Sequence, residues 1–154
     1  MQVMKLFPAF GLLTLVIACN KDKFTTVPQV QGKSISPETV FQGDIIRFVS
    51  KFTDKEGDLD SLLVIYKWYS GTNVTRVYDT MRETLNGHNL PASVKDGEIV
   101  LQYSYNQGGS GRPPTLTPVP ANRDTVATLG IIVIDKAGNR SNYAESGRIT
   151  LKEQ

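Results

Sequence analysis

The chain has 154 residues, of which 40% are hydrophobic, 8% aromatic and 21% charged. This composition is that of one ordinary globular domain and excludes a disordered chain. Lysine and arginine (17) against aspartate and glutamate (15) give a net charge of +2. The basic residues form no cluster that could neutralise a row of phosphates, so no nucleic-acid partner is expected.

The first eighteen residues have the features of an export signal. Lys5 supplies a positive charge, and the thirteen residues from Leu6 to Ala18 carry none. As a helix these thirteen residues would extend about 20 Å, which is shorter than the roughly 30 Å hydrocarbon core of a bilayer. We therefore predict a signal peptide over residues 1–18, removed on export, and not a membrane-spanning helix.

The only cysteine, Cys19, directly follows Val16-Ile17-Ala18. This run resembles the lipobox of bacterial lipoproteins, and the resemblance implies that Cys19 is lipidated and becomes the new N-terminus. The alternative is a plain secretory signal followed by an incidental cysteine. A thioether to diacylglycerol would remove a free thiol that otherwise invites intermolecular disulfides in an oxidising compartment. Two or three acyl chains would then anchor the protein stably to the membrane.

Residues 19–33 are predicted to be the lipidated cysteine and a tether. They contain Pro28 and Gly32 and show neither a helical nor a strand period. The polar Asn20-Lys21-Asp22 is similar to the export signals of Bacteroidetes lipoproteins that reach the outer surface. The resemblance implies a protein of the bacterial outer membrane that faces the cell surface.

From residue 34 onward the hydrophobic pattern has a period of two, which is typical of β-strands. Strands are predicted over 34–40, 44–52, 62–69, 73–81, 98–105, 125–134 and 146–151. The strands 62–69 and 125–134 are apolar on both faces, so we expect them at the centres of their sheets. No window of eleven residues has a helical stripe. The pattern predicts an all-β, antiparallel sandwich of about seven strands over residues 34–154.

Trp68 has the same parity as the apolar residues of its strand, so we expect it in the core between two sheets. The alternative role, stacking on a sugar, would need an exposed ring. The segment 106–124 is rich in glycine and proline and is predicted to be a long connection between strands.

Residues able to do catalytic chemistry are scarce. His88 is the only histidine, and it lies in a turn-rich segment where a solvated side chain is expected. No cysteine and histidine pair could hold zinc, and no nucleophile, base and orienting group are visible together. The sequence therefore predicts a protein that is not an enzyme and has no certain cofactor.

Acidic residues alternate in the loop at 54–60. Asp54, Glu56, Asp58 and Asp60 recur at every second position, and an extended loop would bring these carboxylates to one side. Calcium takes six to eight oxygen ligands and suits such a loop, with Asp135 as a further ligand. The alternative is a solvated turn in which aspartate side chains cap backbone amides.

The loops FTDKEGDLDS at 52–61 and VIDKAGNRS at 133–141 resemble those of bacterial immunoglobulin-like and cadherin-like domains. The resemblance implies an immunoglobulin-like topology, in which these two loops meet at one end of the sandwich. The expected function is that of a lipid-anchored binding or scaffolding module with a protein or glycan partner at the cell surface. The alternative is a carbohydrate-binding lipoprotein that uses exposed aromatics such as Tyr69 or Tyr78.

Overall fold

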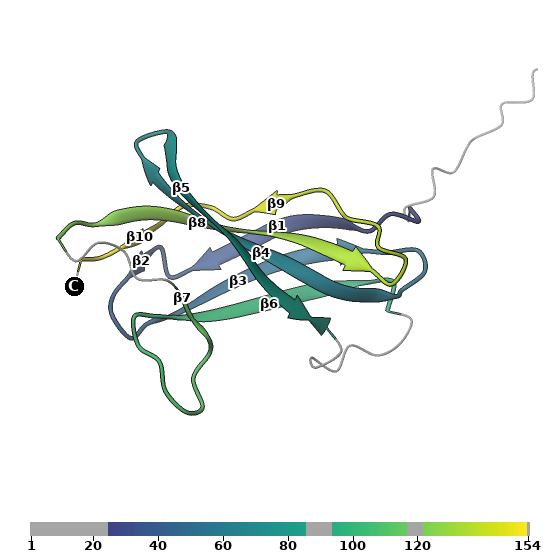
Figure 1. Cartoon of the computed structure of the whole chain (residues 1–154), viewed down its shortest axis with the longest axis horizontal. Coiled ribbons are helices and arrows are strands. Elements are labelled where there is room, and N and C mark those ends of the chain that lie inside the picture. The colour runs from purple at the N-terminus through teal and green to yellow at the C-terminus, as the bar shows by residue number, and fades with distance from the viewer. Residues whose placement is uncertain (1–24, 86–93, 117–121, 154) are drawn as a thin grey trace, which may run out of the picture.

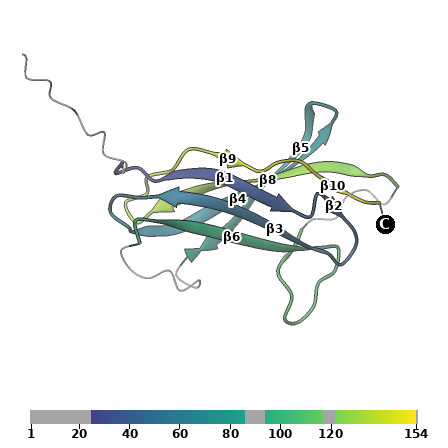
Figure 2. The same ribbon diagram turned by 180° about the vertical axis from the view of Figure 1, so that it is seen from behind.

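The computed structural model describes residues 25–85, 94–116 and 122–153. The predicted signal peptide, Cys19 and His88 lie outside these residues. Within the described ranges, no helix has the length and apolar character needed to cross a membrane. The regular elements are β-strands that form two layers packed face to face (Figures 1 and 2).

The first layer is a four-stranded sheet with the order β1-β3-β6-β7. Its strands are β1 (Gln29–Ser36), β3 (Ile45–Thr53), β6 (Asp96–Tyr105) and β7 (Thr115–Leu116). The second sheet has the order β2-β10-β8-β4-β5, and β9 pairs separately with β8. Its strands are β2 (Thr39–Val40), β4 (Leu59–Ser70), β5 (Asn73–Thr84), β8 (Thr125–Asp135), β9 (Ala144–Glu145) and β10 (Ile149–Leu151).

This strand order confirms the predicted all-β sandwich and matches an immunoglobulin-like topology. The set β1-β3-β6 corresponds to strands A, B and E, and β10-β8-β4-β5 corresponds to G, F, C and C′. Strands β4 and β8 are central, as their apolar faces predicted. The long strands pair antiparallel, as predicted, and the sheets are mixed only because β2 runs parallel to β10 and β7 parallel to β6. Both parallel pairs are two residues long, too short to leave a sequence pattern.

The core lies between the two sheets and follows the alternation of the strands. Ile46, Phe48 and Phe52 of β3 are at most 2% exposed, while Arg47 and Lys51 point to solvent. On β6, the inward face is formed by Ile99, Leu101, Tyr103 and Tyr105, all buried. Trp68 is 6% exposed and meets Tyr66 edge to face, with ring centroids 6.1 Å apart. The prediction of a core tryptophan is confirmed.

The first strand begins earlier than predicted. β1 starts at Gln29, so residues 29–33 belong to the sandwich and the predicted tether to residue 33 is too long. Gln29 pairs with Thr53, and Val30 contributes to the core at 6% exposed. A single apolar residue gives no period along the chain. The strand forms here because β3 supplies the hydrogen-bonding partners.

Candidate functional site

The candidate site lies on the outer face of the six-stranded sheet. Side chains alternate along β4, and Tyr66 and Trp68 point into the core. The alternate residues Lys67 and Tyr69 therefore point outward. Lys67 is paired with Thr128 of β8, whose side chain lies on the same face. Glu145 of β9 pairs with Gly130 of β8 and reaches over this face. Three strands thus bring four polar side chains together.

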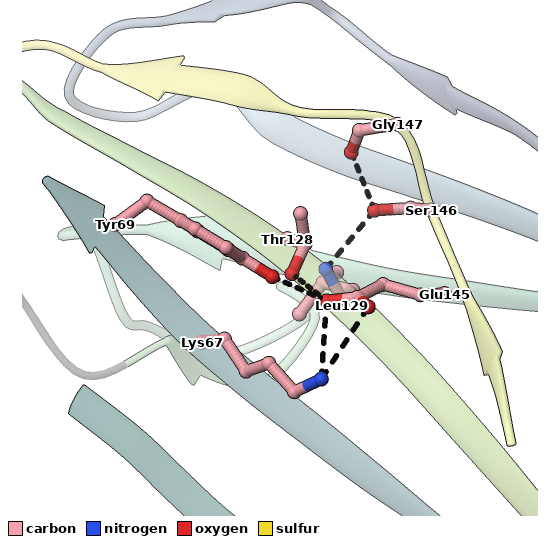
Figure 3. A network of polar contacts seen from close by, with 7 residues as sticks. All are labelled: Lys67, Tyr69, Thr128, Leu129, Glu145, Ser146 and Gly147. Atoms are coloured by element: carbon pink, nitrogen blue, oxygen red, sulfur yellow. Dashed lines mark hydrogen bonds and ion pairs between the residues drawn. The ribbon is translucent and has the colours of Figure 1, made fainter. Parts of the chain in front are cut away.

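Glu145 is the centre of this cluster (Figure 3). Its Oε1 accepts hydrogen bonds from the Tyr69 hydroxyl at 2.8 Å and from Thr128 Oγ1 at 2.5 Å. The Lys67 Nζ lies 3.3 Å from each carboxylate oxygen. The side chains of Lys67 and Glu145 are only 20% and 30% exposed. The carboxylate is therefore fixed from three sides and keeps partial access to solvent.

The environment favours the charged forms of both members of this ion pair. Burial alone would raise the pKa of Glu145, but hydrogen bonds from Thr128 and Tyr69 and the charge of Lys67 outweigh it and lower the pKa. For Lys67 the directions are reversed. Burial alone would lower its pKa, but the neighbouring Tyr143 and Glu145 outweigh burial and raise the pKa. At neutral pH the face therefore carries a paired ammonium and carboxylate.

Two aromatic rings are fixed by cations on the same face. The Lys67 Nζ lies 4.3 Å from the centroid of the Tyr143 ring, and the Arg148 Cζ lies 4.6 Å from that of Tyr69. Arg148 also donates a hydrogen bond to the Gly71 carbonyl at 2.9 Å. These cation–π contacts add to the rigidity of the cluster.

The Tyr143 ring occupies space that Gly130 leaves free. A Cβ atom at position 130 would lie 2.3 Å from the Tyr143 ring and hydroxyl. Any side chain on this residue of β8 would force the ring away from Lys67. Gly130 is therefore needed because the Tyr143 ring occupies the space of a side chain on the outer face, and not because the chain turns there.

Exposed apolar residues flank the polar cluster. Val77 and Val74 of β5 pair with Lys67 and Tyr69 of β4, and their exposed fractions are 53% and 46%. On the other side, Leu63 and Ile65 of β4 and Ile132 of β8 are half-buried on the same face. A rigid polar centre with an apolar surround therefore spans β4, β5 and β8.

The acidic loop and the 133–141 loop meet at one end of the sandwich, as predicted. Leu59 pairs with Asp135, and the amide of Lys136 donates to the Asp58 carbonyl at 3.1 Å. Asp54 is fully buried and Asp135 is 4% exposed, whereas Glu56 is exposed. Four of the five predicted calcium ligands therefore lie close enough for their charges to interact, because Asp54, Asp135 and, more weakly, Glu56 all act on Asp58.

Three carboxylate oxygens at this end, both of Asp135 and one of Asp54, accept hydrogen bonds from backbone or side-chain amides. Asp135 accepts two hydrogen bonds from Asn139, and one oxygen of Asp54 accepts from the Asp58 amide at 2.9 Å. Buried oxygens of Asp54 and Asp58 have no hydrogen-bond partner. Within the described ranges, no group of three or more histidine, cysteine, aspartate or glutamate residues is placed to hold a metal ion. Calcium binding by Asp54, Glu56, Asp58, Asp60 and Asp135 stays a prediction.

Several of the aromatic rings in the described part of the chain are buried, and Phe41, at 57%, is exposed. Tyr66, Tyr103 and Tyr105 are at most 2% exposed. The Tyr69 hydroxyl binds Glu145, and Arg148 covers one face of its ring. The side chain of Tyr78 lies outside the described residues.

No family of known proteins matches the sequence, and no curated protein matches it either. Several solved structures resemble the fold. The Bacillus subtilis sporulation control protein Spo0M is 8% identical, with a TM-score of 0.45 over 83% of this chain and 50% of its own. The Pseudomonas fluorescens alkylpurine DNA glycosylase AlkC, bound to DNA with an abasic-site analogue, is 13% identical, with a TM-score of 0.42 over 83% of this chain and 31% of its own.

A third similar structure is the CARDB domain of the Pyrococcus furiosus protein PF1109, in complex with di-metal ions. It is 10% identical, with a TM-score of 0.33 over 83% of this chain and 91% of that domain. The chain thus spans about half the length of Spo0M and less than a third of AlkC. At these identities the comparisons concern the fold alone.

The comparison with AlkC corrects one sequence-based prediction. The chain was expected not to be an enzyme, but AlkC is one, and it contains a region of similar fold. A β-sandwich can belong to catalytic and to non-catalytic proteins alike. The scarcity of catalytic residues in the sequence was therefore an insufficient reason to exclude catalysis.

Sequence reasoning missed most of the polar cluster. Of the residues in this cluster, the sequence pointed only to Tyr69, as an exposed ring for binding a carbohydrate. Lys67 and Glu145 are far apart in the sequence and meet only through the pairing of β4, β8 and β9. One local signal was present, because Thr128 and Gly130 interrupt an otherwise apolar strand on its outward face.

Proposed function

We propose that this chain is a lipid-anchored protein of the bacterial cell envelope that binds a partner protein through the outer face of the six-stranded sheet. The observation that carries the proposal is the Glu145 cluster, in which Lys67, Tyr69 and Thr128 hold one carboxylate in the middle of an apolar surround.

The chemistry of this face is that of a protein interface. Tyrosine and arginine are enriched at such interfaces, and the side chains that dominate binding are usually rigid and central. Tyr69, Tyr143 and Arg148 are held in place by contacts within the chain. Little side-chain entropy is then lost on binding. The charges of Lys67 and Glu145 are already paired, which lowers the cost of removing them from water.

Val74 and Val77 supply the apolar contact area beside this centre. Both are about half exposed on β5, at the edge of the sheet. Burying such side chains contributes about 25 cal/mol for each Å² removed from water. A partner that covers β4 and β5 would bury both valines and contact the polar cluster at once.

The anchor is proposed from the sequence. The lipobox-like Val16-Ile17-Ala18 precedes Cys19, and β1 begins only ten residues later, at Gln29. At about 3.5 Å per residue, ten residues reach at most about 35 Å. Such a connection would keep the sandwich close to the lipid headgroups. The polar residues after Cys19 favour display on the outer surface.

The anchor is tested with the substitution Cys19→Ser in cells that export the full chain. The wild-type protein is expected in the membrane fraction and to incorporate labelled palmitate, and Cys19→Ser is expected to lose both properties. Digestion of intact cells with a protease distinguishes display on the surface from a periplasmic orientation. Unchanged membrane association of Cys19→Ser would refute the lipid anchor.

A further inference from the structure

Among the residues that the structure describes, strand β6 has an unpaired edge along the middle of its length. On one side it pairs with β3 throughout, from Asp96 to Ser104. On the other side, within the described residues, only the two-residue strand β7 pairs with it, at Ser104 and Tyr105. An immunoglobulin-type sheet of this order has a further strand, D, next to strand E. In this chain the described strands leave most of that position unfilled.

The direction of the backbone groups follows from the hydrogen bonds at the two ends of β6. The amide of Tyr105 donates to Asp44 on the β3 side, and the amide of Ser104 donates to Pro114 on the β7 side. Backbone groups alternate along a strand, so those of Glu98, Val100 and Gln102 point away from β3. The main-chain donors and acceptors of these three residues face the unpaired edge.

A groove runs along this edge between the two sheets. Its first part, of about 200 Å³, is lined by Leu62, Leu85, Ile99 and Leu101 and by Glu83 and Glu98. Glu83 accepts a hydrogen bond from the Tyr103 hydroxyl, and Glu98 forms an ion pair with Lys33. A second part, of about 600 Å³, shares Glu83, Val100 and Leu101 and extends to Pro113 and Pro114 beside β7. Val100 is 44% exposed at the centre of the edge. Exposed main-chain groups therefore lie directly beside a groove with an apolar wall, whose charged residues, Arg82, Glu83 and Glu98, are of both signs.

We propose that this edge binds an extended segment of a partner protein, which adds to the sheet beside β6 in line with β7. The main chain of the segment would pair with Glu98, Val100 and Gln102, and every second side chain would enter the groove. Apolar residues suit the inward positions over Leu62 and Leu85. This second binding surface is independent of the outer face of the six-stranded sheet.

The experiment uses the purified full chain and a fluorescent peptide, Lys-Val-Thr-Val-Lys-Val-Lys, with binding followed by anisotropy. Two versions of the peptide carry N-methyl groups on alternate residues, one on the valines and one on the other residues. In an extended strand, only one of these sets has its amides toward β6. One version is therefore expected to bind at least about tenfold more weakly than the unmodified peptide, and the other to bind almost unchanged.

Two substitutions locate the site on the protein. Val100→Pro removes an amide that faces the open edge and leaves the pairing with β3 possible, so it should weaken binding about tenfold or more. Val100→Ala keeps the amide and is expected to bind as the wild type. Melting curves show whether each variant folds. If Val100→Pro does not fold, the comparison of the two methylated peptides alone tests the proposal. No binding by the unmodified peptide, equal binding by both methylated versions, or self-association of the chain through this edge would overturn the proposal.

Discussion

At the scale of single residues, Asp58 is the position where the local environment opposes the ionised side chain. Burial raises the pKa of Asp58 above its ordinary value of 3.8, and the charges of Asp54 and Asp135 add to this effect. A raised folded-state pKa favours the neutral form. The resulting stability is fully present below about pH 3.8 and is lost as the pH rises through the folded-state pKa. At neutral pH the ionised Asp58 therefore lowers the stability of the fold.

The substitution Asp58→Asn is expected to stabilise the protein at pH 7 in the presence of a chelator. It removes one charge from a cluster in which Asp54, Asp135 and Glu56 all oppose the ionised Asp58, so the repulsion within the folded state falls. We expect the melting temperature to rise by roughly 2–4 °C, the shift that about 1 kcal/mol makes in a protein of this size. A melting temperature equal to or below that of the wild type in chelator would contradict this reasoning.

The same melting curves, repeated in millimolar calcium, test the predicted metal site. A bound ion would offset the repulsion between Asp54, Asp58 and Asp135 and raise the melting temperature of the wild type. Asp58→Asn would lose this effect. Equal melting temperatures of the wild type in calcium and in chelator would remove the calcium site and leave the loop as a capped turn.

At the scale of the strands, the outward face of β8 is shaped by Gly130. Gly130→Ala is expected to destabilise the protein by about 1–3 kcal/mol, because the added Cβ displaces the Tyr143 ring from its place beside Lys67. In a Tyr143→Ala background the same change should be neutral or slightly stabilising, since alanine is less costly than glycine in a strand. Urea unfolding of the two single variants and the double variant measures the coupling. Additive effects would show that the ring does not depend on the glycine.

The long strands could be predicted from the sequence because alternation is a local property. The core faces of β3 and β6 and the central positions of β4 and β8 follow directly from the order of apolar residues. The start of β1 at Gln29 and the two-residue strands β2, β7 and β9 could not be predicted in this way. They have too few apolar residues to show a period, and they form only where a neighbouring strand supplies partners.

At the scale of the whole molecule, the topology decides which distant residues meet. The meeting of the 52–61 and 133–141 loops could be predicted, because a sandwich of this order places both loops at one end. The Glu145 cluster could not be predicted. It depends on the register between β4, β8 and β9, which no single stretch of sequence encodes.

The central claim is that the outer face of the six-stranded sheet contacts a partner protein at the cell envelope. The most direct measurement is photo-crosslinking in intact cells, with p-benzoylphenylalanine placed at Val77 beside the cluster or at the control position Phe41. Both positions are more than half exposed, and Phe41 lies outside both proposed surfaces. The account predicts a discrete adduct of higher mass from Val77 and none from Phe41, and Lys67→Glu should reduce the adduct from Val77. Equal adducts from both positions, or an adduct from Phe41 alone, would contradict it.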